Sequence, residues 1–186
     1  METAEREAIL DSSDSIHAFR LLSILLDYPD QEGFDLAALQ EEVNQLAHPK
    51  IAEHLQKFMT YLGEHAREDV AAIYVDTFDF HSQTSIYLTQ SVNSDEREDA
   101  LEQLRKTYEE IGLFLQTDEL PDYLPLVLEF VTLAPYELAS ELLIDFYPVI
   151  QDISHLLNQT DNPYAWVIEA CRNQIDQFLF VVEKVR

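Results

Sequence analysis

The segment Ser15-Ile-His-Ala-Phe-Arg-Leu-Leu-Ser-Ile-Leu-Leu-Asp-Tyr28 sets a pattern that the rest of the chain repeats. Its apolar residues recur at steps of three and four, which is the period of one face of an α-helix. They are Ile16, Phe19, Leu22, Leu25 and Leu26. Residues 13–15 all have side chains that can cap a helix, and Pro29 follows the segment. We therefore predict an amphipathic helix here.

The same period predicts further helices downstream. They cover residues 36–46, 49–63, 67–78, 95–111, 123–131, 135–157 and 163–182. Ser94 or Asp95 is expected to cap the long helix that ends near Ile111, and Asp122 the helix that follows it. Asn162 before a proline is a typical start for the last helix. Residues 79–94 are expected to be irregular or a short helix, and residues 112–120 a connection.

These helices predict an all-α fold, a single-domain bundle of about seven to nine helices. Residues 1–13 are expected to form a mobile acidic N-terminus, and residues 14–186 a single all-helical domain. The chain has 186 residues, of which 47% are hydrophobic, enough for a core of its own. Its three glycines are isolated, which excludes a P-loop and a dinucleotide-binding fingerprint. So few glycines also argue against a many-turned β-sandwich or barrel.

Net charge is the unusual feature of the composition. Eleven basic residues against 36 acidic residues give −25 at neutral pH. Such a surface repels phosphate backbones and anionic lipid, so we expect no nucleic-acid partner and no membrane insertion. No apolar run is long enough to span a bilayer. The single cysteine, Cys171, excludes an internal disulfide and fits a reducing compartment. The simplest interpretation is a cytoplasmic protein with a cationic partner.

The acidic excess is concentrated in one region. Residues 107–171 form a stretch of 65 residues with no Lys or Arg and twelve carboxylates. Glu137, Glu141 and Asp145 are spaced four residues apart and share one helix face, close to the line of Asp152. One interpretation is a solvated face that keeps the protein in solution. The other is a receptor for an Arg-containing segment, in which the neighbouring apolar residues form a groove for a partner helix.

No catalytic or metal-binding constellation stands out. The six histidines are scattered, and a lone cysteine builds no thiolate site. Cys171 is flanked by apolar residues and is expected to pack in the core. We therefore expect no enzymatic activity, no metal and no cofactor. A stiff acidic stretch, Asp118-Glu-Leu-Pro-Asp-Tyr-Leu-Pro125, is instead a reasonable place to hold a peptide.

Four segments together resemble a known family. They are Tyr74-Val-Asp-Thr-Phe-Asp79, Thr84-Ser-Ile-Tyr-Leu-Thr89, Glu119-Leu-Pro-Asp-Tyr-Leu-Pro-Leu-Val-Leu-Glu-Phe130 and Asn162-Pro-Tyr-Ala165. Their order and spacing are similar to those of the respiratory nitrate reductase assembly chaperones (the delta-subunit, NarJ type), within the redox-enzyme maturation chaperones that serve molybdoenzymes. Asp95 and Arg97 match a basic run that opens the long helix in this branch, whereas Asp99 and Ala100 depart from it.

The resemblance implies a non-enzymatic, client-specific chaperone without a cofactor of its own. It would bind the basic N-terminal segment of the apo catalytic subunit of a molybdoenzyme, nitrate reductase above all, and hold it competent for molybdenum cofactor insertion before membrane docking. The residues expected to contact this peptide are Tyr74, Phe78, Glu119, Asp122, Tyr123, Leu124 and Glu129. Two alternatives remain: a structural accessory subunit of a redox complex, and an acidic protein that mimics DNA to block a basic partner.

Overall fold

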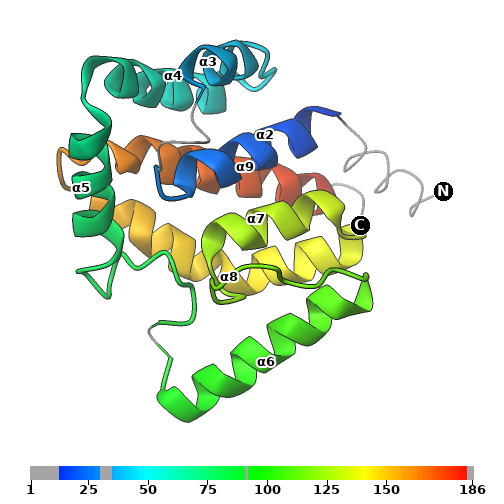
Figure 1. The fold of residues 1–186 in the computed structure, drawn as a ribbon. Coiled ribbons are helices and arrows are strands. Elements are labelled where there is room, and N and C mark those ends of the chain that lie inside the picture. The colour runs from blue at the N-terminus through cyan, green and yellow to red at the C-terminus, as the bar shows by residue number, and fades with distance from the viewer. Residues whose placement is uncertain (1–12, 30–34, 91, 184–186) are drawn as a thin grey trace.

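The computed structural model describes residues 13–29, 35–90 and 92–183. Within these ranges the chain forms eight helices, labelled as in Figure 1. They are α2 (Ser13–Leu26), α3 (Leu36–Asn44), α4 (Pro49–Glu64), α5 (Arg67–Phe78), α6 (Ser94–Glu110), α7 (Leu124–Leu133), α8 (Tyr136–Leu157) and α9 (Tyr164–Glu183). The predicted all-α single domain is confirmed. The predicted mobile segment 1–13 lies outside the described residues except at position 13, where α2 begins.

Helices α2 and α9 run through the middle of the bundle, with α3 and α4 on one side and α7 and α8 on the other (Figure 1). α2 packs against α7 and α9, and α9 packs against α4 and α8. The ring of Phe19 on α2 meets that of Phe178 on α9 edge-on, with 5.5 Å between the ring centroids. Ser23 Oγ on α2 also donates a hydrogen bond of 2.9 Å to the Pro125 carbonyl on α7.

Two predictions about individual helices are confirmed. The apolar stripe of α2 faces the core, where Phe19, Leu22 and Leu26 are fully buried. Burial of each such side chain contributes about 1.5–3 kcal/mol. At the start of α9, Asn162 Oδ1 accepts a hydrogen bond of 2.9 Å from the Tyr164 backbone N–H, as expected for a capping residue.

The predicted caps of α6 and α7 are wrong. In the described structure α6 follows Asn93 and α7 follows Tyr123, and neither of these two N-cap residues makes a side-chain capping bond. Ser94 lies inside the first turn of α6. The Asp122 carboxylate accepts hydrogen bonds from Thr89, which is distant in sequence. A tertiary contact has replaced the local cap, and the spacing of residues does not reveal such a contact.

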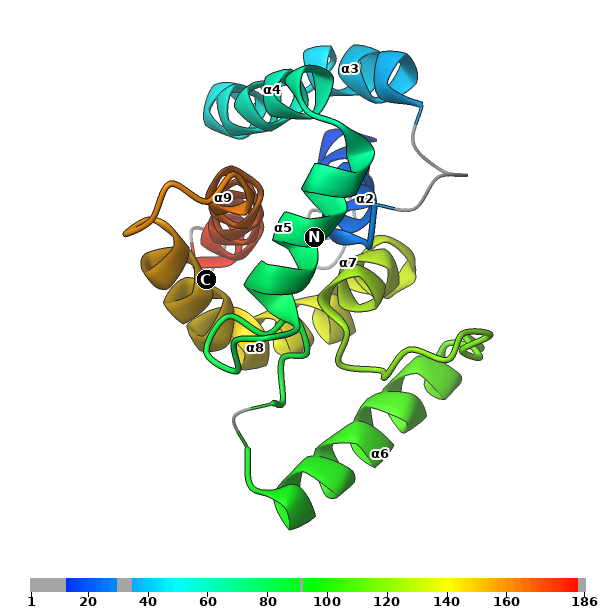
Figure 2. The same cartoon turned by 60° about the vertical axis from the view of Figure 1, so that its left-hand side comes forward.

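Helix α6 lies at the edge of the molecule and is joined to the bundle by two connections (Figure 2). Of its 17 residues, Leu104 and Tyr108 are buried. The helix ends in a Schellman motif, in which the Leu113 N–H donates to the Tyr108 carbonyl at 3.0 Å. Gly112 adopts φ 80°, a conformation that favours glycine because it has no Cβ. This turn directs residues 113–123 back towards α7.

A network of charged side chains joins α8 to α9. Arg172 on α9 donates to Glu169 and to Asp176, each at 2.6 Å. Two hydroxyls on α8 complete the network, because Ser154 donates to Glu169 at 2.6 Å and Tyr147 donates to Asp176. The Arg172 guanidinium, helped by the Ser154 hydroxyl, lowers the pKa of Glu169 to about 2. The ionised form of Glu169 therefore stabilises the folded state.

We expect Glu169→Gln to lower the free energy of unfolding by about 1–2 kcal/mol at pH 7, and by less as the pH falls. The Glu169 carboxyl takes up its proton near pH 4.5 when unfolded but only near pH 2 when folded. The stabilisation is therefore lost within that window. Urea unfolding of both proteins at pH 7, 4 and 2.5 measures the difference. Glu98→Gln, at an exposed position on α6, is the control. A difference that stayed constant down to pH 2.5 would contradict this account.

Among the described residues, no group of three or more His, Cys, Asp or Glu side chains is placed to hold a metal ion. No helix in the described ranges combines the length and the apolar content needed to cross a bilayer. Cys171 is fully buried, and burial raises the pKa of its thiol to about 12. This thiol stays protonated at neutral pH and packs in the core.

Candidate functional site

Two irregular segments far apart in the sequence meet beside α6. The described residues between α5 and α6, which are 79–90 and 92–93, are irregular, as predicted. One isolated antiparallel bridge pairs Tyr87 with Tyr123, just before α7. The Leu88 N–H donates a hydrogen bond of 3.0 Å to the Asp122 carbonyl at the same place. The strand-like residues of the first segment therefore do have a partner, in the connection that joins α6 to α7 (residues 111–123).

Tyr74 and Tyr123 form a buried polar junction between α2, α5 and the start of α7. Their hydroxyl oxygens lie 2.8 Å apart. Tyr123 Oη donates to Asp27 Oδ1 at 2.8 Å, and Tyr74 Oη donates to the Leu26 carbonyl at 3.1 Å. Burial raises the pKa of both phenols, so both stay protonated. The junction fixes the position at which the connection enters α7.

Phe78 and Leu124 belong to the core on either side of this junction. The ring of Phe78 packs edge-on against Tyr74 and Tyr164, with centroid distances of 5.0 and 5.2 Å. Leu124 is fully buried at the first position of α7. Neither side chain reaches the surface in this structure. Both support the connection from beneath.

Asp122 links three elements. Its carboxylate is 0% exposed, and Oδ2 accepts hydrogen bonds from Thr89 N–H at 3.0 Å and from Thr89 Oγ1 at 2.6 Å. Arg97 on α6 donates from Nε to Thr89 Oγ1 at 3.2 Å, and its Nη2 lies 3.8 Å from Asp122 Oδ2. Thr89 thus donates to the carboxylate and accepts from the guanidinium. The connection, the irregular segment before α6 and α6 itself meet at this cluster.

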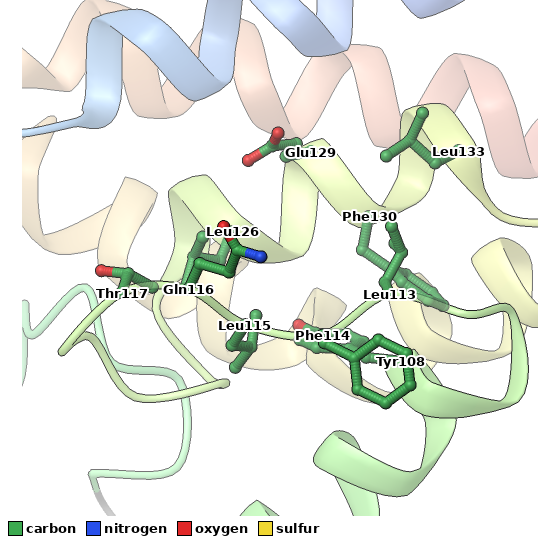
Figure 3. Close-up of a pocket in the computed structure, with 10 residues that line it drawn as sticks. All are labelled: Tyr108, Leu113, Phe114, Leu115, Gln116, Thr117, Leu126, Glu129, Phe130 and Leu133. Atoms are coloured by element: carbon green, nitrogen blue, oxygen red, sulfur yellow. The ribbon is translucent and has the colours of Figure 1, made fainter.

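Glu119 and Glu129 are the two predicted site residues that are exposed. Glu119 Oε2 accepts a hydrogen bond of 2.5 Å from Tyr87 Oη. Glu129 lies beside a pocket of about 360 Å³ between α7 and residues 113–117 (Figure 3). Polar and apolar groups line this pocket in similar measure, and the lining includes Phe114 and Leu133, which are 69% and 54% exposed.

A larger groove lies between α6 and α8, and we call it the α6–α8 groove. Its volume is about 570 Å³. Its apolar lining residues are Leu88, Val92, Ala100, Leu104, Leu138, Leu142, Phe146 and Val149. Its polar lining residues are Thr89, Gln103, Thr107, Glu110, Glu141 and Asp145. No Lys or Arg is among these described lining residues, so every charged group that lines the groove is a carboxylate.

A second hollow of about 310 Å³ continues the groove along α8 and shares Leu88 and Val149 with it. Asp152 and His155 lie on its α8 side. Together the two hollows follow α8 from Leu138 to Leu156. At 1.5 Å per residue this is about 27 Å, the length of a helix of about 18 residues.

The structure separates the seven predicted peptide-contacting residues into two exposed residues, Glu119 and Glu129, and five buried ones. The buried residues, which shape the connection, are Tyr74, Phe78, Asp122, Tyr123 and Leu124. Their direct contact with a peptide stays a prediction, and it requires the connection to move. Of the acidic face singled out on α8, Glu141 and Asp145 line the groove and Asp152 lines its continuation, whereas exposed Glu137 lies outside both.

Sequence reasoning missed the α6 side of the groove. Four of its residues recur at helical spacing: Ala100, Gln103, Leu104 and Thr107. That spacing is a usable signal. Two of the four are polar and one is small, however, so the longer apolar residues beside them, such as Leu101 and Tyr108, define the face that stands out.

Known proteins are similar to this chain over most of its length. The family model described as nitrate reductase delta subunit matches residues 44–168. The probable nitrate reductase molybdenum cofactor assembly chaperone NarJ of Bacillus subtilis is 32% identical over 159 residues, which cover 84% of this chain and 86% of that protein. NarJ of Escherichia coli is 34% identical over 155 residues, covering 78% of this chain and 64% of that protein. This chain belongs to the nitrate reductase delta subunit family.

Proposed function

We propose that this chain is an assembly chaperone for nitrate reductase, and that it binds the basic N-terminal segment of the apo catalytic subunit before the molybdenum cofactor is inserted. Support for the chaperone role comes from relatives named as molybdenum cofactor assembly chaperones. Support for the binding mode comes from the α6–α8 groove, which combines apolar side chains with carboxylates and has no cation among its described lining residues.

Charge supports a basic ligand. Glu110 projects from α6, and Glu141 and Asp145 project from α8, so carboxylates stand on both sides of the groove. All three carboxylates are exposed, so each can pair with an Arg or Lys of the ligand. Complementary charge of this kind speeds encounter and fixes orientation.

Shape supports a helical ligand. The groove and its continuation are about 27 Å long, and their floor is formed by branched and aromatic side chains such as Leu142 and Phe146. An amphipathic helix that places apolar residues against this floor directs its neighbouring basic residues at the carboxylates on either side. The buried apolar area supplies affinity, and the charges supply selectivity for basic segments.

Isothermal titration tests the proposal with the full chain. The ligand is a synthetic peptide of about 20 residues, corresponding to the N-terminus of the nitrate reductase catalytic subunit from the same organism. We expect saturable 1:1 binding, and at least about tenfold weaker binding when the Lys and Arg residues of the peptide are replaced by Gln. Absence of binding, or equal affinity for the two peptides, would contradict the proposal.

A further inference from the structure

One side of the α6–α8 groove is a helix held mainly at its two ends. Near the C-terminus of α6, Tyr108 Oη donates a hydrogen bond of 2.7 Å to the Pro121 carbonyl. The ring of Tyr108 packs against that of Phe130, with 4.6 Å between the ring centroids. Near the N-terminus, Arg97 contacts Thr89 and Asp122. Between these two points Leu104 is the buried residue of the helix. The position of this side of the groove therefore depends on few contacts.

We propose that Asp122 is a positioning residue, which holds the N-terminal half of α6 in place through Thr89 and Arg97. The carboxylate is fully buried, and its Oδ1 has no hydrogen-bond partner in the described structure. Its charge is compensated by two hydrogen bonds from Thr89 and by the Arg97 guanidinium at 3.8 Å. A buried carboxylate needs such compensation. Because Arg97 is the cation beside it, the carboxylate draws α6 towards the connection.

Thr89 gives the contact a direct link to the groove. Its hydroxyl accepts from Arg97 and donates to Asp122, and the residue itself lines the groove. The same hydrogen bonds therefore set both the floor of the groove and the distance of α6 from it. The consequence for binding rests on the function proposed above. A loosened α6 leaves a bound helix less enclosed, so the helix dissociates faster.

Hydrogen exchange of the free protein tests the positioning role without any ligand. We expect Arg97→Ala to speed exchange of the amides of residues 97–104 about fivefold to tenfold, while amides in the middle of α2 and α9 keep their rates. Asp122→Asn keeps an acceptor for Thr89 but removes the charge, and it is expected to speed exchange in the same amides. Arg105→Ala is the matched control, because Arg105 is an exposed arginine on the same helix.

The double variant distinguishes a shared contact from two unrelated effects. If Asp122 acts through Arg97, adding Asp122→Asn to Arg97→Ala changes α6 exchange less than it does in the wild type. The proposal is overturned if Arg97→Ala and Arg105→Ala have equal effects on α6. It is also overturned if exchange rises equally in α2 and α9, since that result indicates general destabilisation.

A binding measurement separates this inference from the proposed function. If the catalytic-subunit peptide binds, Arg97→Ala is expected to raise its dissociation rate at least about threefold more than Arg105→Ala does. If the peptide does not bind, the proposed function fails, whereas the exchange result still decides the role of Asp122. If the peptide binds and dissociates at equal rates from both variants, α6 does not enclose the ligand and the inference about binding is wrong.

Discussion

Replacing Asp122 with alanine is expected to lower the free energy of unfolding by about 3 kcal/mol. The substitution removes the acceptor for the backbone N–H and hydroxyl of Thr89, which is itself buried. It also leaves Arg97 without the carboxylate beside it. Buried donors without partners account for most of the expected loss. Urea unfolding followed by circular dichroism measures it.

Asp118→Ala is the control for this prediction. Asp118 belongs to the same connection but is exposed, and its replacement is expected to change stability by less than about 0.5 kcal/mol. Equal stabilities of the Asp122→Ala and Asp118→Ala proteins would show that the buried carboxylate makes no net contribution to the free energy of unfolding. The contacts of Asp122 would then supply no free energy to hold α6 in place.

Neutralising the carboxylates of the α6–α8 groove is expected to produce the largest loss of binding. The triple variant Glu110→Gln, Glu141→Gln and Asp145→Asn should bind the basic peptide about tenfold to 150-fold more weakly than the wild type. Each interfacial pair that keeps some contact with water contributes about 0.5–1 kcal/mol, which limits the total to this range. Titration calorimetry at low salt measures the effect. At high salt the two proteins should converge, because exposed charges are then screened.

A second triple variant controls for net charge. Glu41→Gln, Glu64→Gln and Asp76→Asn change the charge by the same amount at exposed positions on α3, α4 and α5, away from the groove. We expect these changes to weaken binding by less than about twofold, since distant charges act only through the long-range field. If both triple variants weakened binding equally, the overall charge of the protein would govern affinity rather than the groove.

The helices could be predicted because their signals are local. The three- and four-residue spacing of Phe19, Leu22 and Leu26 depends on one turn following another, and a proline or an asparagine cap marks a helix end within a few residues. The caps expected for α6 and α7 failed for the opposite reason. Asp122 has the side chain of a capping residue, yet its partner Thr89 lies 33 residues away. A local sequence pattern does not reveal a contact between residues so far apart.

The site could be predicted only in part. The acidic spacing on α8 identified Glu141 and Asp145, because a helix fixes which residues share a face. Exposure could not be judged in the same way. Tyr123 is typical of a binding surface by composition, but its hydroxyl is used within the protein by Asp27 and Tyr74. The α6 side of the groove depends on how two distant helices approach each other, and no local pattern in the chain encodes that approach.

Amide chemical shifts of the isotopically labelled full chain, recorded during titration with the catalytic-subunit peptide, test the central claim most directly. The α6–α8 groove as the binding site predicts that the largest changes lie at residues 88–89, 100–110 and 138–149, which contain most of its lining residues. Large changes confined to residues 113–117 and 126–133 would instead place the peptide in the pocket beside Glu129 and contradict the account.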